Sequence, residues 1–204
     1  MNVMVVLGHP RRGSFNHGIA EAVVATLREE EHEVWFHDLY RERFDPVLPH
    51  EEISVGAKLD PLVALHCREL AACDGLVIIH PNWWGQPPAI LKGWIDRTFR
   101  SGVAYHFSSG DSGEGIPTPL LRAHEALVLN TTDTPAERES AAFGDPLDTQ
   151  WKNCVLRYCG IRSVVRKTYG VVVTSAPEQR CRWLDDVRFQ VKASFPRTLR
   201  PAHH

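Results

Sequence analysis

DGLVIIHPNWWGQPPAILKGWIDRTF, residues 74–99, combines three structural elements in a row. Its first seven residues are mainly apolar and stop at Pro81, which is typical of a strand buried on both faces of a parallel sheet. A loop with two tryptophans follows. Pro88 suits the first turn of a helix, and the apolar spacing after it predicts a helix over residues 89–99. Strand, loop and helix in this order form the unit from which parallel α/β sheets are built.

The same alternation runs through the rest of the chain. Further strands are predicted at residues 2–8, 32–39, 125–131 and 164–173, and further helices at residues 15–27, 60–72, 147–159 and 177–195. We therefore expect an α/β protein with a doubly wound, five-stranded parallel sheet and helices on both faces. Such sheets hold ligands at the carboxyl ends of their strands. The places to look for a site are the residues just after Gly8, Ile79, Asn130 and Val173.

Composition bounds the class of protein. The 204 residues carry 23 Lys and Arg against 25 Asp and Glu, so the net charge is −2 and the broad basic field of a nucleic-acid-binding protein is missing. The same value argues against the acidic surface of a one-electron carrier. Five cysteines without a CxxC pair favour a reducing compartment over disulfides or zinc, and no metal is expected. No apolar run reaches the ~18 residues of a membrane span. We predict a cytoplasmic protein, without membrane insertion, that acts on a small molecule.

The loop after the first strand, GHPRRGSFN at residues 8–16, has no established nucleotide signature. It lacks the Gly-Lys-Ser/Thr of a Walker loop, the glycine spacing of a dinucleotide fingerprint and the G-x-S-x-G of a nucleophile elbow. Hydroxyl, amide and backbone N–H groups instead converge at a helix N-terminus, which suits a phosphate. In the alternative interpretation, Ser14 only caps the helix and the arginines are solvated.

The loop after the third strand contains Trp83 and Trp84 among glycine and prolines. A loop has no regular face on which to bury two indoles, so the pair is suited to flank a flat aromatic ligand. A hydrophobic plug over the sheet or a subunit contact are the alternatives. Trp94 and Phe99, in contrast, fall at helical spacing and are predicted to pack in the core.

HP and SFN at residues 9–16, PNWWGQPPAILKGWIDR at residues 81–97 and VAY at residues 103–105 together resemble the flavodoxin-like NAD(P)H:quinone oxidoreductases. The resemblance covers nearly the whole chain and implies one flavodoxin-like domain over residues 1–195, with a flexible tail over residues 196–204. It implies an enzyme that passes two electrons from NAD(P)H to a quinone or similar acceptor, as a homodimer. FMN is the expected flavin and FAD the second choice. The alternative is a flavin-binding regulatory subunit of a membrane potassium efflux system.

The resemblance also implies a set of site residues. The flavin phosphate region falls on His9, Ser14, Phe15 and Asn16, the flavin ring borders Pro81, Asn82, Trp83 and Trp84, the turn after the fourth strand contributes Thr131, Thr132 and Asp133, and Tyr105 lies at the substrate face. This chain has Asp133 and Thr134 where the family has two glycines, and Phe143 where it has a histidine. We therefore expect backbone amides of residues 133–134 to stabilise negative charge on the reduced flavin. The Asp133 carboxylate should point away and cap a turn with Thr134 and Pro135.

Overall fold

The computed structural model describes residues 1–108 and 114–197 of the chain. Five strands form one sheet in which every pair is parallel, in the order β2-β1-β3-β6-β7. They are β1 (Asn2–Leu7), β2 (Glu33–Asp38), β3 (Gly75–Pro81), β6 (Glu125–Thr132) and β7 (Ser163–Gly170). The predicted five-stranded, doubly wound α/β architecture is confirmed. The predicted tail lies outside the described residues beyond residue 197.

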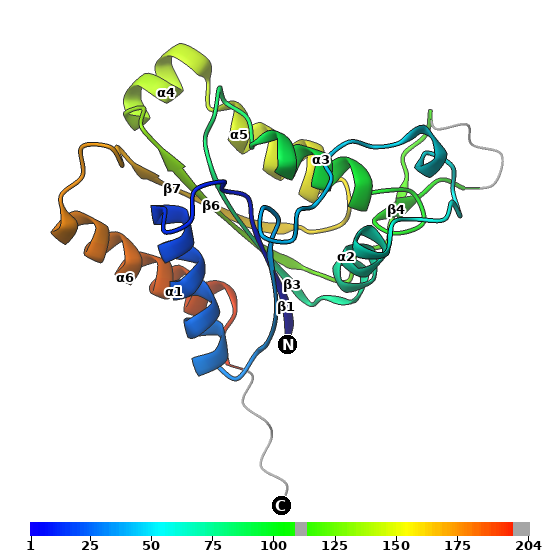
Figure 1. The fold of residues 1–204 in the computed structure, drawn as a ribbon, viewed down its shortest axis with the longest axis horizontal. Helices are drawn as coiled ribbons and strands as arrows, with labels where there is room; N and C mark the ends of the chain where they lie inside the picture. Colours follow the sequence, from blue (N-terminus) through cyan, green and yellow to red (C-terminus); the bar gives the residue numbers. More distant parts are fainter. Residues whose placement is uncertain (109–113, 198–204) are drawn as a thin grey trace, which may run out of the picture.

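Helices cover both faces of the sheet (Figure 1). Helices α1 (Phe15–Glu29) and α6 (Pro177–Ser194) lie together on one face, while α2 (Pro61–Ala72) and α3 (Ala89–Thr98) lie on the other with α5 (Pro146–Thr149) and the π-helix η2 (Gln150–Leu156). The remaining elements are η1 (His50–Glu52), the antiparallel pair β4 (Tyr105–His106) and β5 (Thr118–Pro119), and α4 (Ala136–Phe143). No helix within the described ranges has the length and apolar character needed to cross a membrane.

The continuous apolar strands follow from this double cover. In β1, Met4 and Val6 pack into the core under α2 and α3, whereas Val5 and Leu7 pack into the core under α1 and α6. All four side chains are fully buried. Successive side chains of a strand point to opposite faces, so a strand covered on both sides needs apolar residues at every position. Trp94 is fully buried between α3 and its neighbours, as predicted.

The chain departs from the predicted elements around residue 147. In place of one regular helix, α5 runs into the wider turns of η2. Cys154 is exposed there, while Cys159 is buried. Wide π turns rotate successive side chains away from the 3.6-residue positions of a regular helix, so burial here does not follow the spacing of the predicted helix. Residues 136–143 form α4, in which no side chain is buried.

Gly93 offers a test of how closely α3 packs. A Cβ atom at this position would lie 2.1 Å from the backbone oxygen of Pro46, whereas a Cβ at Gly18 in α1 would meet nothing within 4 Å. We expect Gly93→Ala to lower the free energy of unfolding by about 1–3 kcal/mol through steric overlap. Gly18→Ala, the matched helical control, should raise it by about 0.5–1 kcal/mol. Urea unfolding of the ligand-free proteins measures both, and equal effects of the two changes would contradict the packing argument.

Candidate cofactor site

The loops after β1, β3 and β6 meet at the carboxyl ends of these strands and form a pocket of about 210 Å³. Backbone hydrogen bonds join these loops: the Gly8 N–H donates to Ile79 O at 2.9 Å and the Asn82 N–H to Thr131 O at 2.7 Å. All of the residues predicted to bind the cofactor line this pocket except Trp84, namely His9, Ser14, Phe15, Asn16, Pro81, Asn82, Trp83, Thr131, Thr132 and Asp133. Thr134, expected to contribute its backbone amide, lines the same pocket, as do Arg11 and Val172, which no sequence pattern indicated.

The first loop delivers a helix N-terminus to the pocket. Gly13 has a φ of +67°, a left-handed conformation that favours glycine, and the next residue, Ser14, is the N-cap of α1. The positive end of the helix and its free N–H groups therefore face the pocket. This arrangement suits an anion such as the phosphate of a cofactor.

Asn16 gives independent evidence that a ligand belongs here. Its side chain is 2% exposed, and its Nδ2 donates to Thr131 Oγ1 at 2.8 Å, yet its Oδ1 has no hydrogen-bond partner. A buried polar atom without a partner costs about 1–3 kcal/mol, so such atoms are rare in folded proteins. The threonine hydroxyl can donate as well as accept, so the amide can present either its oxygen or its nitrogen to the pocket. The residues present fit a flavin with a phosphate at this end.

The second loop holds its two tryptophans outward. Trp83 and Gln86 exchange backbone hydrogen bonds of 3.0 and 2.9 Å, which closes a tight turn, and the side chain of Asn82 accepts from the Gly85 N–H at 3.0 Å. Trp83 is 42% exposed, and Trp84 is fully exposed. The alternative of a hydrophobic plug over the sheet is therefore wrong. Trp84 lines a neighbouring pocket together with Phe143 of α4.

The turn after β6 differs from its prediction. The cap of this turn is the hydroxyl of Thr132, which accepts from the Thr134 N–H at 3.0 Å, so the Thr134 amide is not free to face a ligand. The Asp133 carboxylate caps no turn with Thr134 and Pro135; its Oδ1 accepts from the Val173 N–H at 2.8 Å. Asp133 thereby fastens the loop after β7 to the pocket, a contact between distant segments that no local pattern indicates.

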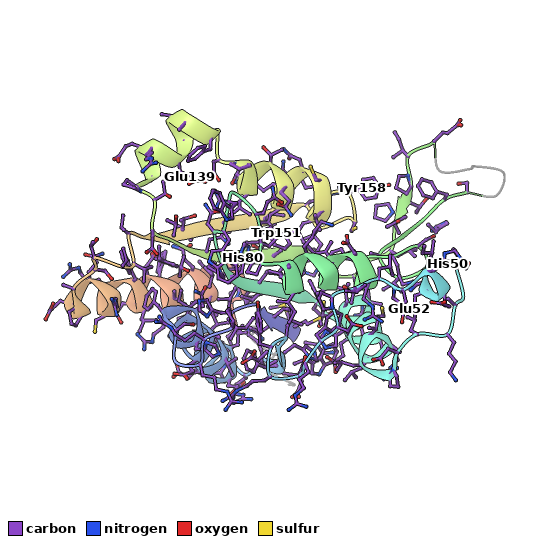
Figure 2. The ribbon with its side chains drawn as sticks, turned by 45° about the horizontal axis from the view of Figure 1, so that its top comes forward. His50, Glu52, His80, Glu139, Trp151 and Tyr158 are labelled. Atoms are coloured by element: carbon purple, nitrogen blue, oxygen red, sulfur yellow. The ribbon has the colours of Figure 1, made fainter. Side chains whose placement is uncertain are left out.

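A buried polar network surrounds His80 at the end of β3, with Trp151 beside it (Figure 2). His80 is fully buried, and burial lowers its pKa to about 4 against the opposing effect of its bond to Pro81, so the ring is neutral. Its Nδ1 bonds to the Pro81 carbonyl at 2.8 Å, and its Nε2 accepts from Trp151 at 2.9 Å and from Asn130 at 2.8 Å. These bonds fix the carbonyl at which the tryptophan loop begins, so His80 has a structural role.

Tyr105 lies apart from the other predicted site residues. It belongs to β4, which lies on the opposite side of the molecule from α4 and the start of α1 (Figure 1). Its ring packs against Phe107 and Tyr158, with centroid distances of 5.7 and 5.5 Å. Within one chain, Tyr105 therefore does not reach the pocket.

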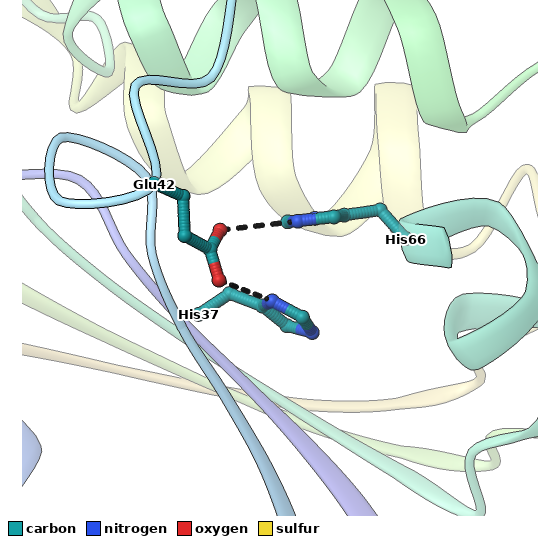
Figure 3. Close-up of side chains that lie close together, drawn as sticks. All are labelled: His37, Glu42 and His66. Atoms are coloured by element: carbon teal, nitrogen blue, oxygen red, sulfur yellow. Dashed lines mark hydrogen bonds and ion pairs between the residues drawn. The ribbon is translucent and has the colours of Figure 1, made fainter. Parts of the chain in front are cut away.

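His37, Glu42 and His66 form the one group within the described residues whose geometry could suit a metal ion (Figure 3). Glu42 bridges the two rings, at 2.8 Å from His37 Nδ1 and 3.1 Å from His66 Nε2. Trp94 donates its indole N–H to His66 Nδ1 at 2.9 Å, so the single ring proton of a neutral His66 sits on Nε2, the atom that would have to bind the metal. His66 therefore donates its Nε2 proton to Glu42 and accepts from Trp94, so the three residues belong to a hydrogen-bonded network.

His37 is the charged member of that network. Its second nitrogen, Nε2, lies 2.5 Å from Glu69 Oε2, so both ring nitrogens face carboxylates and both donate. Burial lowers the pKa of His37, but the hydrogen bonds to Glu42 and Glu69 outweigh it and raise the pKa above its ordinary value. Burial raises the pKa of Glu42, and its bonds to His37 and His66 reverse this and lower the pKa to about 2. The network joins β2, its following loop and α2.

Comparison with known proteins places the chain in a family. Residues 1–186 match the family described as having the flavodoxin-like fold, and the chain belongs to that family. It is 30% identical over 178 residues to an uncharacterized NAD(P)H oxidoreductase of Haemophilus influenzae, covering 83% of this chain and 84% of the relative.

Two solved structures are similar to this one. The NAD(P)H:quinone oxidoreductase from Methanothermobacter marburgensis has a TM-score of 0.82 and 26% identity, with 94% of this chain and 98% of that chain covered. An FMN-dependent NADH-azoreductase from Bacillus anthracis, solved with FMN, has a TM-score of 0.72 at 14% identity and covers 95% of this chain and 99% of its own. The second likeness is one of fold.

The His37 network predicts how stability depends on pH. The raised pKa of His37 adds stability below pH 6.5 that is lost as pH rises through the folded-state value, and the lowered pKa of Glu42 adds stability above pH 4.5 that is lost as pH falls toward about 2. The two groups together therefore add most to the free energy of unfolding between pH 4.5 and pH 6.5. We expect His37→Gln to flatten the alkaline decline in the free energy of unfolding, measured by urea titration at several pH values. His124→Gln, at an exposed histidine, is the control, and equal alkaline slopes in wild type and His37→Gln would contradict the assignment.

Proposed function

We propose that this protein is a flavin-dependent NAD(P)H oxidoreductase that passes two electrons to a quinone or a similar small acceptor. The observation that carries the proposal is the pocket itself: residues assigned to flavin binding from three separate loops line one cavity, and the buried Asn16 amide leaves one atom for a ligand. The relatives named as NAD(P)H oxidoreductases support the same class of reaction. A bound flavin would supply the chemistry by accepting hydride from NAD(P)H and releasing two electrons to the acceptor.

The protein's own groups bind and orient in this proposal. Ser14, Asn16 and the start of α1 hold the phosphate end, and the half-exposed Trp83 offers an apolar wall for the flavin ring. His80 keeps the Pro81 carbonyl in place at the start of the tryptophan loop. Hydride transfer requires no side chain to act as acid or base, so positioning is the main task of the protein.

FMN is the proposed cofactor. The pocket contains one helix start suited to a phosphate, and the structurally similar azoreductase is described as FMN-dependent. FAD stays the second choice. The alternative function, a regulatory subunit of a potassium efflux system, has no specific observation in its favour and stays an expectation from the sequence.

The flavin content of the purified protein tests the function. We expect a yellow protein that releases FMN on denaturation, and Asn16→Asp should weaken FMN binding because it places a carboxylate beside the phosphate. Riboflavin, which lacks the phosphate, should lose less affinity in the same variant. Asn153→Asp makes the same chemical change at an exposed position and should bind FMN as the wild type does. If the purified protein contains no flavin and binds none at micromolar concentration, the proposed function is wrong.

We also propose that two copies of the chain assemble so that the partner subunit's Tyr105 closes the acceptor side of the pocket. Large apolar side chains are exposed around β4 and β5, which a subunit contact would cover. They are Val47, Ile53, Val55, Ile116 and Leu120, with exposed fractions of 69%, 63%, 73%, 97% and 38%.

Sedimentation and kinetics test the dimer together. We expect a dimer in solution, and Tyr105→Ala should raise the KM for the acceptor while leaving the flavin content unchanged. Phe189→Ala, which removes an exposed aromatic from α6 on the other side of the sheet, is the control for loss of an exposed ring. A monomer with full activity would rule the arrangement out.

A further inference from the structure

Ser14, His17 and Asp38 form a hydrogen-bonded chain behind the start of α1. Ser14 Oγ lies 2.9 Å from His17 Nδ1, and His17 Nε2 lies 3.2 Å from Asp38 Oδ2. Ser14 and Asp38 are each 4% exposed. The three side chains come from the loop after β1, the first turn of α1 and the end of β2. Because the bonded groups run from hydroxyl to imidazole to carboxylate, their order determines which atoms carry the protons.

The proton count of this chain depends on the charge of His17. The ionised carboxylate of Asp38 can only accept, so His17 Nε2 carries a proton and donates it. A neutral imidazole has no second proton, so its Nδ1 must accept, and the Ser14 hydroxyl donates to it. A protonated imidazole instead donates from Nδ1 to Ser14 Oγ. Only in this second state is the hydroxyl proton of Ser14 free to turn toward the pocket.

A phosphate in the pocket would distinguish these two states. Ser14 lines the pocket beside Asn16, whose unpartnered Oδ1 independently indicates a ligand at this helix start. The oxygens of a phosphate dianion accept hydrogen bonds and do not donate them. With His17 neutral, Ser14 presents only lone pairs to such an anion. With His17 protonated, Ser14 donates to it, and the imidazolium adds a positive charge that Asp38 holds in place.

We propose that His17 is a positioning residue that couples the binding of the flavin phosphate to the uptake of one proton from solvent. The proposal rests on the flavin site proposed above and deepens it, because it assigns a protonation state to the phosphate end. It predicts that FMN binds most tightly when His17 is protonated. FMN affinity then falls as pH rises through the titration range of His17, by up to about tenfold per pH unit.

Other charges surround His17 and act on both states. They come from the loop after β1, from α1, from the segment at the end of β2, from the turn after β6 and from α6. The groups are His9, Arg11, Arg12, Glu21, Arg28, Asp38, Arg41, Asp133 and Arg180. Arg41 shares the Asp38 carboxylate, with its Nε 3.7 Å from Oδ2. None of these groups lies between Ser14 and His17 in the bonded chain. They shift the balance of the two states without changing which state frees the serine hydroxyl.

The first measurement follows His17 itself. Histidine-labelled protein is titrated by NMR without ligand, with saturating riboflavin and with saturating FMN. We expect the midpoint of the His17 titration to move to higher pH with FMN but not with riboflavin, because only FMN carries the phosphate. Calorimetry in buffers of different ionisation enthalpy, near pH 7.5, where the phosphate is mainly a dianion, should show net proton uptake with FMN. Riboflavin should show none.

Two variants and a control sharpen the test. His17→Gln keeps a polar side chain but cannot gain a proton, so FMN affinity should become nearly independent of pH between 7 and 8, where the phosphate is mainly a dianion. Asp38→Asn removes the carboxylate that holds the imidazolium and should reduce proton uptake. His124→Gln removes an exposed histidine outside the pocket and should keep the wild-type pH dependence. Circular dichroism checks that each variant is folded, and the wild-type comparison of FMN with riboflavin needs no variant.

The possible failures are distinguishable. If the protein binds FMN and riboflavin with the same His17 titration and no proton uptake, the flavin site stands and His17 only caps the helix through Ser14, so this proposal is overturned. If FMN affinity keeps its pH dependence in His17→Gln, another group takes up the proton and the proposal is overturned as well. If no flavin binds, the proposed function itself fails.

Discussion

The register of β1, β3 and β6 is the constraint on which the site depends. Leu7 pairs with Ile79, and Pro81 pairs with Thr131, so the three strands end within a few residues of one another. The order of the sheet reverses at β1, and the chain therefore leaves neighbouring strands in opposite directions and opens a crevice at their ends. Loops of different sequence, tens of residues apart in the chain, meet there because the ladder places them there. The register of the sheet, rather than the sequence of any one loop, therefore sets the position of the pocket.

Polar side chains buried next to this edge make it rigid. His80 is neutral and takes part in three hydrogen bonds under the tryptophan loop, whereas His37 is charged and held between two carboxylates. His37 and Asp38 are neighbours in β2 and point to opposite faces: one joins the network with α2, and the other reaches His17 in α1. The end of β2 therefore anchors a helix on each side of the sheet. Removing one partner here would lower the free energy of unfolding by more than the net contribution of the hydrogen bond, because the other buried group would be left without a partner.

The sequence predicted the parts of this structure that depend on local pattern. Continuous apolar runs marked the five strands, Ser14 marked the start of α1, and the family motifs marked the residues that share the pocket. The parts that depend on contacts between distant residues were not predictable in this way. Asp133 accepts a hydrogen bond from the amide of Val173, and Glu42 joins two histidines from different elements. No spacing of residues in the sequence predicts either contact. His17 had a weak signal, a histidine three residues after the N-cap, which would place its ring beside Ser14.

The two ends of the pocket are held to different degrees. At the end beside the start of α1, Ser14 and Asn16 are buried, with Ser14 bonded to His17 of α1 and Asn16 to Thr131 of β6. At the other end, α4 has no buried residue, and the described hydrogen bond that ties its side chains to the pocket loops runs from Asn82 to Glu139 at 2.9 Å. Changes at the first end disturb the core, while changes in α4 alter what lies beside Trp84 at little cost in stability. A fold built this way can therefore keep the residues beside the start of α1 unchanged while the side chains next to Trp84 vary.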